Sequence, residues 1–404
     1  MAGFDLVICG GGPAGLATAI AARQAGLTAL VLERAGPSPD KACGEGLMPD
    51  GLRALRELGA LELIEPSACA PFHGIRYLLG DGRSVEGRFR RGDGLGVRRT
   101  ALSAALESRA RALGVELRRA SLEGFEVSAE GVAITTARGR GDEAPETIDA
   151  RLLVGADGLQ SKVRRLAGLD APAAGPRRFG LRRHFSCVPW SDLVEVHWAD
   201  GVECYVTPAG ARRVNVAFLW DDDLRGKSAT ATAGAAPEGV PEKPGFETLL
   251  ARFPAVAARL AGAEADSEVR GCGPLSRPVR ARASGRVALV GDAAGYVDAI
   301  TGQGLSLAFR SAQALIAALV AGALVPANVP ALPGPGPAPR TLDPAALPAA
   351  LRRYHLSLRR PWLRYAIPAR ALLLLAGGPW LRRVLLGLIA RSPRLFGLLL
   401  GLVG

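Results

Sequence analysis

The amino-terminal region alternates apolar runs with glycine. FDLVIC (4–9) is an apolar run of strand length, and it leads into the glycine-rich stretch GGGPAG (10–15). The next apolar positions recur with helical spacing, and LTALVLER (27–34) returns to a strand pattern. Strand, loop, helix and strand fit within about thirty residues, which is the length of one βαβ unit. The pattern therefore predicts an α/β fold that begins with such a unit.

Two later apolar runs end in a similar way. RLLV (151–154) and VALV (287–290) have the composition of buried strands, and each leads into a loop with glycine and aspartate. The first loop is GADGLQSKVRR (155–165). The second, GDAAGYVDAITGQG (291–304), continues into a segment with helical spacing, so it is a predicted strand-to-helix crossover at a carboxyl edge.

Residues 176–220 have a different pattern. Apolar and polar residues alternate, β-branched and aromatic side chains are frequent, and ADG and PAG turns separate the runs. This pattern predicts an antiparallel meander. Two segments rich in alanine, proline and glycine, 228–245 and 325–348, are predicted to be loops rather than domains.

The first glycine cluster has the spacing of a dinucleotide-binding loop. Gly10 allows the tight turn, Gly12 lets backbone approach a pyrophosphate, and Gly15 allows a helix to pack closely on a strand. Glu33 ends the second strand, where a carboxylate can accept hydrogen bonds from ribose hydroxyls. The alternative is a tight turn in an ordinary α/β domain, but the complete βαβ context favours FAD or NAD(P). The predicted site also includes Pro13, Ala14 and Arg34.

Four segments together resemble the FAD-dependent monooxygenase superfamily with the p-hydroxybenzoate hydroxylase fold, in its geranylgeranyl-reductase-like branch. They are GGGPAG with LER, then KACGEGLMP (41–49), GADGLQSKVRR and GDAAGYVDAITGQG. The resemblance covers roughly residues 1–325, and the motifs in this order are more specific than any one of them. It implies noncovalent FAD, NAD(P)H as a transient reductant, and an antiparallel sheet that covers the substrate cavity.

The resemblance and the chemistry of the residues together predict the flavin contacts. Asp292 can accept hydrogen bonds from ribityl hydroxyls, while Gly302 and Gly304 let backbone N–H groups approach the isoalloxazine. Asp298 has no such role and is explained at least as well as a turn or helix-capping residue. Asp157 lies near the pyrophosphate in the family, although a solvated turn also explains it. The resemblance further implies Gly291, Gln303 and Arg99 as cofactor contacts.

The segment KACGEGLMP carries the candidate catalytic residue. In the geranylgeranyl-reductase branch, Cys43 and Gly44 would lie near the reactive face of the flavin. The alternative is a buried cysteine without function, because cysteines are commonly buried. The sequence shows no nearby base that would make this thiol a nucleophile.

Candidates for the substrate cavity come from the predicted meander. They are His184, His197, Tyr205 and Thr207, and for each a packing or rim position is the alternative.

The match to each branch of the family is incomplete. The reductases carry aromatic residues around ECYVTP (203–208), where only Tyr205 and Pro208 fit. The aromatic hydroxylases have proline in place of Ala299. Flavin halogenases carry two tryptophans one residue apart, and none of the 5 tryptophans here has that spacing, which argues against halogenation.

Charge and cysteine usage narrow the partners. The formal net charge is +12, and residues 351–404 contain ten arginines and no acidic residue, so almost all of the excess lies in the tail. Few aromatic residues accompany it, which argues against a nucleic-acid groove. The 6 cysteines are scattered without histidines at ligand spacing, so we expect no metal site and reduced thiols in a cytoplasm. The first residues form structure rather than a signal peptide, and a transmembrane helix is not expected.

The carboxyl-terminal tail has two interpretations. Residues 381–389 place apolar side chains at helical spacing with arginines off the stripe. Such a helix either docks on an anionic bilayer as a peripheral contact or packs on the flavin domain. The predicted organisation of the chain has four parts: a discontinuous FAD-binding domain (1–71, 97–175 and 270–324), a substrate-binding sheet domain (72–96 and 176–269), a Pro/Ala-rich loop (325–348), and basic amphipathic C-terminal helices (349–404).

Three functions are consistent with these observations. The leading one is a cytoplasmic FAD- and NAD(P)H-dependent monooxygenase that hydroxylates or epoxidises a lipophilic, prenylated or polyketide-like substrate. The second uses reduced flavin to saturate an alkene of a prenyl chain. The third is a prenyl-binding escort protein that keeps the fold without redox chemistry. Both redox reactions need a dry cavity, and the cofactor rather than a protein side chain carries the chemistry.

Overall fold

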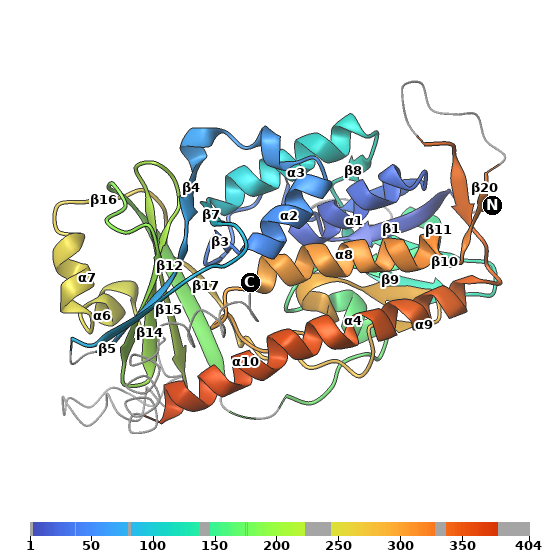
Figure 1. The fold of residues 1–404 in the computed structure, drawn as a ribbon. Helices are drawn as coiled ribbons and strands as arrows, with labels where there is room; N and C mark the ends of the chain where they lie inside the picture. Colours follow the sequence, from blue (N-terminus) through green and yellow to red (C-terminus); the bar gives the residue numbers. More distant parts are fainter. Residues whose placement is uncertain are drawn as a thin grey trace.

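The computed structural model describes residues 3–36, 38–79, 82–137, 146–173, 175, 177–222, 244–327 and 337–378. Two sheets lie at opposite ends of the molecule, and helices connect and cover them (Figure 1). The predicted α/β class, with a Rossmann-like unit, a second antiparallel sheet and C-terminal helices, is confirmed.

The first sheet is built around five parallel strands in the order β19-β11-β1-β2-β8. β1 lies between β11 and β2. Because both faces are covered, five of its six residues are buried, and all of these five except Asp5 are apolar. A short strand, β18, and two longer strands, β10 and β9, extend the sheet antiparallel. The strands are β1 (Phe4–Cys9), β2 (Ala29–Leu32), β8 (Glu116–Arg118), β9 (Ser121–Val127), β10 (Val132–Ala137), β11 (Glu146–Gly155), β18 (Ala283–Ser284) and β19 (Val287–Leu289).

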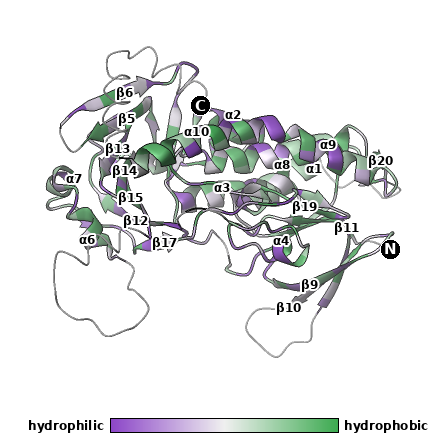
Figure 2. Ribbon diagram, turned by 90° about the horizontal axis from the view of Figure 1, so that it is seen from below, coloured by the Kyte–Doolittle hydropathy of each residue, from purple (hydrophilic) through white to green (hydrophobic). Residues whose placement is uncertain are grey.

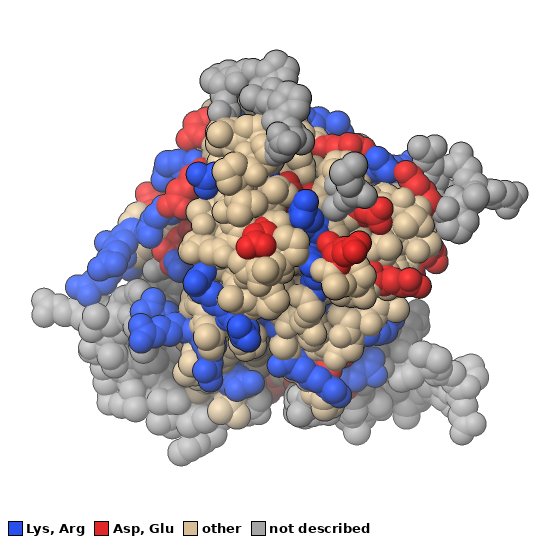
Figure 3. Space-filling model, turned by 90° about the vertical axis from the view of Figure 1, so that its right-hand side faces the viewer, with Lys and Arg blue, Asp and Glu red and all other residues tan. Residues whose placement is uncertain are grey.

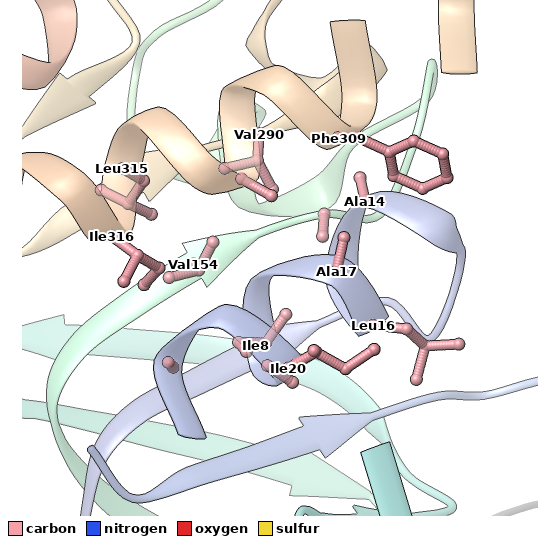
Figure 4. Packing of buried hydrophobic residues seen from close by; sticks show 14 of the residues in the cluster. Ile8, Ala14, Leu16, Ala17, Ile20, Val154, Val290, Phe309, Leu315 and Ile316 are labelled. Carbon is pink, nitrogen blue, oxygen red and sulfur yellow. The ribbon is translucent and has the colours of Figure 1, made fainter. Parts of the chain in front are cut away.

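Helices α1 (Pro13–Gln24) and α8 (Gly304–Val320) pack against each other over this sheet. Figure 4 shows the contact, in which Ile20 of α1 lies beside Ile8 and Ile316 of α8 lies beside Val154. Buried alanines on α1 allow the close approach, because a larger side chain would separate the helices. Helices α2 (Pro49–Glu57) and α3 (Arg99–Ala112) flank this pair, and α4 (Lys162–Leu166) follows β11.

The second sheet has the order β16-β12-β15-β14-β13-β5-β6, with β17 also paired to β12. β13, β14 and β15 form the predicted antiparallel meander, but β12 pairs with β15 rather than with β13. The parallel pairing of β5 with β13 was not predicted. The strands are β5 (Gly74–Leu79), β6 (Ser84–Arg88), β12 (Arg178–Ser186), β13 (Val194–Ala199), β14 (Val202–Pro208), β15 (Val214–Asp221), β16 (Glu264–Ala265) and β17 (Arg270–Cys272).

The two faces of the second sheet have different neighbours. The outer face packs on α6 (Phe246–Leu250) and α7 (Pro254–Arg259) through a cluster of aromatic side chains. The inner face is turned to the FAD-binding part of the chain (Figure 1). A small sheet of β3 (Gly46–Leu47), β7 (Gly94–Val97) and β4 (Cys69–Phe72) lies between the two large ones.

The C-terminal part differs in detail from the prediction. The segment predicted as a loop, 325–348, carries most of a small sheet of β20 (Leu324–Pro326) and β21 (Arg340–Leu342), and α9 (Leu347–Ser357) already begins there. α10 (Arg359–Gly377) continues after α9 along one edge of the molecule and reaches the second sheet (Figure 1). The predicted loop at 228–245 lies almost entirely outside the described residues, and the predicted amphipathic stripe at 381–389 lies wholly outside them.

Candidate cofactor site

The first glycine loop is packed so tightly that two of its positions exclude a side chain. Gly10 has φ 111°, and a Cβ there would lie 2.4 Å from the Ala156 carbonyl oxygen. A Cβ on Gly15 would lie 1.8 Å from the Gly10 carbonyl oxygen. Both distances are well inside contact, so α1 approaches the strands as the sequence motif predicts.

The N-terminus of α1 has no side-chain cap among the described residues. Its N-cap is Gly12, which provides no side-chain hydrogen bond, and Pro13 occupies the first turn. The N–H of Gly11 donates to Glu33 Oε2 at 2.7 Å, and the N–H of Ala35 donates to Oε1 of the same carboxylate. Glu33 therefore holds the loop at the end of β2. An open helix N-terminus beside this loop is suited to a phosphate.

The second glycine loop ends at the N-terminus of α8, which has no side-chain cap in the part of the chain that the structure describes. Gly291 has φ 59°, and its N–H donates to Ser311 Oγ of α8 at 2.8 Å, which anchors the start of the loop. Gln303 is the N-cap of α8 and makes no capping hydrogen bond, and Gly302 before it has φ 66°. Within the described residues, the side chain of Asp292 forms neither a hydrogen bond nor an ion pair, although it is half-buried.

Positive side chains surround the two loops. Arg99 is buried, and its Nη2 lies 3.4 Å from where a Cβ on Gly12 would be. Burial raises the pKa of Asp292 to about 6, while Arg99, Arg164 and Lys41 act in the opposite direction. Desolvation lowers the pKa of Lys41, whereas the nearby carboxylates of Glu33 and Asp157 raise it. These charges therefore gather around the glycine loops.

Asp157 has a different role from the one predicted. Its carboxylate accepts from Ser161 Oγ at 2.5 Å and from the backbone N–H of Lys162 and Val163 at 2.6 and 3.1 Å. It therefore caps the N-terminus of α4, with Ser161 as the N-cap residue. Asp157 raises the pKa of Lys41, so it lies near the cofactor site. Most of its hydrogen-bonding capacity, however, is used by the protein.

The segment with Cys43 and Gly44 connects the cofactor loops to the second sheet. Cys43 Sγ accepts from the Glu45 N–H at 3.3 Å, and Asn215 Nδ2 of β15 donates to the Cys43 carbonyl at 3.2 Å. Burial raises the pKa of Cys43, although Arg99 opposes this effect. The thiol therefore keeps its proton at neutral pH. Nothing within 4 Å restricts a Cβ on Gly44.

Glu45 is the centre of a buried junction. It is 1% exposed and has φ 60°, which is uncommon for a residue with a side chain. One carboxylate oxygen accepts the Arg99 N–H at 2.9 Å, and the other lies 2.6 Å from His184 Nε2. His184 is fully buried and contacts Ser267 Oγ through Nδ1 at 2.8 Å. His184 is thus a structural link in the protein, not a free cavity residue as predicted.

The other cavity candidates divide between the two faces of the second sheet. Tyr205 points to the cofactor side, and its hydroxyl donates to the Ile300 carbonyl at 3.3 Å. Thr207 shares that face, 3.7 Å from where a Cβ on Gly46 would be. His197 lies on the opposite face, where its Nε2 is 3.3 Å from Glu195 Oε2. The predicted role of His197 in a cavity with Tyr205 is therefore wrong, because adjacent positions in paired strands face opposite sides.

Asp298 links the second glycine loop to the sheet. Its Oδ2 pairs with Arg178 Nε at 2.9 Å, and Arg178 also pairs with Glu203 at 2.5 Å. All three are buried. Tyr365 of α10 accepts the N–H groups of Val297 and Asp298 on its hydroxyl and donates to the Asp298 carbonyl at 2.8 Å. The loop is thus fixed from two sides.

Three important residues were not assigned from the sequence. Arg164 is 3% exposed and donates to the Ala293 carbonyl at 3.2 Å and to Asp170 at 2.5 Å, so it holds the second glycine loop. Lys41 adds charge to the site, and Glu45 connects it to the sheet. Arg164 lies inside GADGLQSKVRR, and the other two inside KACGEGLMP. Their place in these motifs was therefore the available signal.

The residues present fit FAD. The N-terminus of α1 and the arginines suit a pyrophosphate, and the N-terminus of α8 suits a ring that gains negative charge. The carboxylate of Asp292, which has no partner among the described residues, suits a polyhydroxyl chain. Within the described residues, no group of three or more histidine, cysteine or acidic side chains could hold a metal ion. None of the helices in the described ranges has the length and hydrophobicity needed to cross a bilayer.

The fold and site define a flavin-dependent enzyme. The family described as FAD binding domain matches residues 4–323, and the chain belongs to this family. The resemblance derived from the four motifs is therefore confirmed at the level of the family.

Curated relatives have several activities. Digeranylgeranylglycerophospholipid reductase 1 of Methanopyrus kandleri is 30% identical over 324 residues, covering 76% of this chain and 77% of the relative. Dialkyldecalin synthase of Streptomyces rugosporus is 28% identical over 316 residues, covering 76% and 63%. A 12-dehydrotetracycline 5-monooxygenase/anhydrotetracycline 6-monooxygenase of Streptomyces rimosus is 35% identical over 184 residues, covering 44% and 35%. The chain thus spans less than two thirds of the last two relatives.

Solved structures share the fold along nearly the whole chain. OxyS anhydrotetracycline hydroxylase from Streptomyces rimosus has a TM-score of 0.70 at 24% identity, covering 99% of this chain and 75% of that one. The flavin-dependent brominase Bmp2 has a TM-score of 0.75 at 18% identity, covering 99% and 93%. At these identities the likeness shows the fold alone.

Proposed function

We propose that the protein is an FAD-dependent oxidoreductase, a monooxygenase that uses NAD(P)H and hydroxylates or epoxidises a lipophilic, prenylated or polyketide-like substrate. The observation that supports flavin binding is the half-buried carboxylate of Asp292, which has no partner among the described residues, together with the N-termini of α1 and α8, which have no side-chain cap there. The monooxygenase among the relatives supports the reaction type.

The residues of the chain bind and orient the cofactor, which supplies the redox chemistry when bound. The backbone from Gly10 to Gly15 and the N-terminus of α1 would hold the pyrophosphate with Arg99, and Glu33 would accept from ribose. Asp292 would accept from the ribityl chain. The open N-terminus of α8 would direct its partial positive charge at the ring, where negative charge on reduction is stabilised.

The second sheet would exclude water from this chemistry. Apolar side chains of β5 and β13 pack against Leu372 and Leu375 of α10, and Tyr205 bonds to the second glycine loop. These contacts place apolar side chains along part of the cofactor side of the sheet. A lipophilic substrate fits such surroundings better than a charged one.

A prenyl-chain alkene reductase is the second candidate. The reductase of Methanopyrus kandleri matches over a larger share of both chains than the monooxygenase does. Cys43 keeps its proton because burial raises its pKa, and it lies on the loop that joins the cofactor site to the sheet. A protonated thiol could supply the proton that alkene reduction requires.

The deciding experiment measures flavin and product together. We expect the purified protein to be yellow, and we expect its photoreduced flavin to reoxidise rapidly when mixed with oxygen. Turnover with NAD(P)H or dithionite on prenylated lipids and aromatic polyketides should add one oxygen atom to a product. Oxygen-independent gain of two hydrogen atoms would establish the reductase instead, and a colourless protein would favour the non-redox escort function.

Cys43→Ala separates the two reactions. A monooxygenase should keep most of its activity, because a small apolar group also excludes water. A reductase that uses this thiol as its acid should slow by ~100-fold or more. Cys187→Ala is the matched control, since burial also raises the pKa of Cys187 but its side chain packs against the outer aromatic cluster of the second sheet.

A further inference from the structure

The outward face of α10 has exposed apolar residues between two rows of arginines. Leu363, Ile367 and Leu374 are 52%, 62% and 72% exposed. With ~100° between successive helical residues, these three lie within about 40° of one another. Arg359 and Arg370 flank them on one side, and Arg360 and Arg364 on the other; all four are exposed. We call this set of seven residues the basic apolar face.

The charge on this face has no acidic partner within the described residues. Residues 344–378 contain six arginines and no acidic residue. Within the described part of the chain, none of the four arginines of the basic apolar face forms an ion pair. The cation rows are therefore free to meet an anionic partner.

The apolar surface continues beyond α10 onto α9. Leu356 is 57% exposed and lines a hollow of about 720 Å³ between α9 and the first sheet. Val127, which is 48% exposed, lines the same hollow. Figure 1 shows that α9 and α10 follow one edge of the molecule, and Figure 2 shows hydrophobic and hydrophilic residues along both helices. At the α9 end, basic side chains lie mainly along the lower edge of the face in Figure 3, and acidic ones mainly above them.

We infer that the basic apolar face docks on the surface of an anionic membrane. An apolar strip between two rows of arginines lets the leucine and isoleucine side chains enter the interface while the guanidinium groups meet lipid headgroups. A second copy of this chain fits less well, because a symmetric contact would bring arginine rows together without acidic residues to pair with them. The seven residues include no aromatic side chain on which a nucleic-acid base could stack.

The inner side of the same helix touches the cofactor loop. Tyr365 is 1% exposed and holds the backbone at Val297 and Asp298, and Trp362 packs beside it. Docking would therefore place the membrane one helix away from the loop that carries Asp292. A lipophilic substrate could then reach the protein from the bilayer; this last step depends on the proposed function, whereas docking itself does not.

Cosedimentation with vesicles tests the docking. The full-length flavoprotein should bind vesicles of phosphatidylcholine with 30% phosphatidylserine and bind phosphatidylcholine alone far less. Binding should weaken as salt is raised, because salt screens the arginines. The triple variant Arg359→Gln, Arg360→Gln, Arg370→Gln should lower the partition coefficient by ~100-fold, about fivefold for each arginine.

A matched variant controls for net charge. Arg56→Gln, Arg91→Gln, Arg119→Gln removes three exposed arginines on other elements, and its partition coefficient should stay within about threefold of wild type. Equal loss in both triple variants would overturn the proposal, because net charge rather than this face would then cause binding.

The apolar strip is tested separately. Ile367→Ser with Leu374→Ser should lower by ~10-fold the binding that persists at 0.5 M salt, which depends on inserted apolar area. The control pair Leu63→Ser with Val188→Ser changes residues of similar exposure and should have no effect. Flavin absorbance and the thermal midpoint of each variant show that it is folded.

Two further results would overturn the inference. Unchanged vesicle binding in both face variants would assign binding to another part of the chain. A dimer seen by light scattering that dissociates in the face variants, with no vesicle binding in wild type, would identify the face as a contact between copies.

Discussion

The cofactor site and the junction beneath the second sheet both contain buried charged and polar residues, but only those of the junction are paired. By the junction we mean Glu45 with His184, and Arg178 with Glu203 and Asp298. At the cofactor site, the carboxylate of Asp292 has no partner in the described structure, and the N-termini of α1 and α8 have no side-chain caps. At the junction, Arg178 pairs with Glu203 and Asp298, and His184 Nε2 lies 2.6 Å from Glu45 Oε2. Both regions are largely buried. Pairing, rather than polarity or burial, therefore distinguishes a ligand site from a structural contact.

The difference also explains how the two parts are held together. Arg178 joins Asp298 of the cofactor loop to Glu203 of β14, and Glu45 joins α3 to β12 through His184. These links come from residues far apart in the chain, so they orient the sheet relative to the flavin site. The unpaired groups are left for a ligand. Changes at the junction should thus affect stability, and changes at the site should affect cofactor binding.

The largest effect is expected from removing the cation of the buried group formed by Arg178, Glu203 and Asp298. Arg178→Met leaves the carboxylates of Glu203 and Asp298 buried beside each other without a cation, which should lower the free energy of unfolding by ~3–5 kcal/mol. Urea unfolding measures the change. Arg111→Met is the control, because the Arg111–Glu107 pair is exposed and should contribute under ~0.5 kcal/mol. Similar losses in the two variants would show that the buried group has no special role.

Removing the charge of Asp292 at the cofactor site should raise the stability of the flavin-free protein rather than lower it. The folded pKa of Asp292 is about 6 against an ordinary value of 3.8, so the folded flavin-free protein binds this proton more tightly than the unfolded chain does. Its stability therefore falls as pH rises from about 4 to 6. Asp292→Asn should make the flavin-free protein more stable at pH 8, by up to about 3 kcal/mol, with no difference below the ordinary pKa.

The same substitution should weaken FAD binding by ~10- to 100-fold, because a charged acceptor is lost. Thermal midpoints of the flavin-free protein across pH and flavin titration of each variant measure the two effects. Asp149→Asn, at an exposed position, is the control and should change neither. If Asp292→Asn lowered stability at pH 8 or left flavin affinity unchanged, Asp292 would belong with the junction and not with the ligand site.

Glycines sharpen the same distinction at the level of packing. Gly15→Ala places a Cβ 1.8 Å from the Gly10 carbonyl oxygen, so α1 must move and stability should fall by ~1–3 kcal/mol with loss of flavin. Gly44→Ala meets nothing within 4 Å and should change stability by less than ~0.5 kcal/mol. Any effect of Gly44→Ala on turnover would then come from contact of the added methyl group with the flavin or the substrate. Equal destabilisation by both would contradict the packing account.

Local signals made the cofactor half of the fold predictable. The loops at Gly10 and Gly302 each lie between a strand and a helix that are adjacent in sequence, so periodicity and glycine spacing were enough to place them. Asp157 was harder, because a turn, a ligand contact and a helix cap have the same local sequence. Its commitment to α4 is visible only from its contacts with Ser161 and Lys162.

Long-range pairing made the second half less predictable. β5 pairs in parallel with β13, which lies more than a hundred residues further along the chain, and no local pattern reports such a partner. The side on which His197 lies depends on the register of β13 with β14, where one position reverses the face. Glu45 binds groups 54 and 139 residues away, so its motif indicated importance without indicating a partner.

The smallest expected effect concerns which nitrogen of His184 carries the proton. Ser267 Oγ accepts the backbone N–H of His184 at 3.0 Å and an Arg182 Nη1–H at 3.3 Å. The Ser267 hydroxyl therefore donates its proton to His184 Nδ1, and the imidazole proton on Nε2 is donated to Glu45. Glu45→Gln should cost only ~1 kcal/mol, because the amide can keep the bond to Arg99 while its NH2 group forces the imidazole proton to Nδ1. Nitrogen NMR of the 4 histidines can resolve this change, with Nε2–H in wild type and Nδ1–H in the variant. An unchanged Nε2–H in the variant would show that Glu45 does not set the imidazole tautomer. A loss of stability as large as that of Arg178→Met would show that the negative charge of Glu45, and not only its hydrogen bonds, holds the junction.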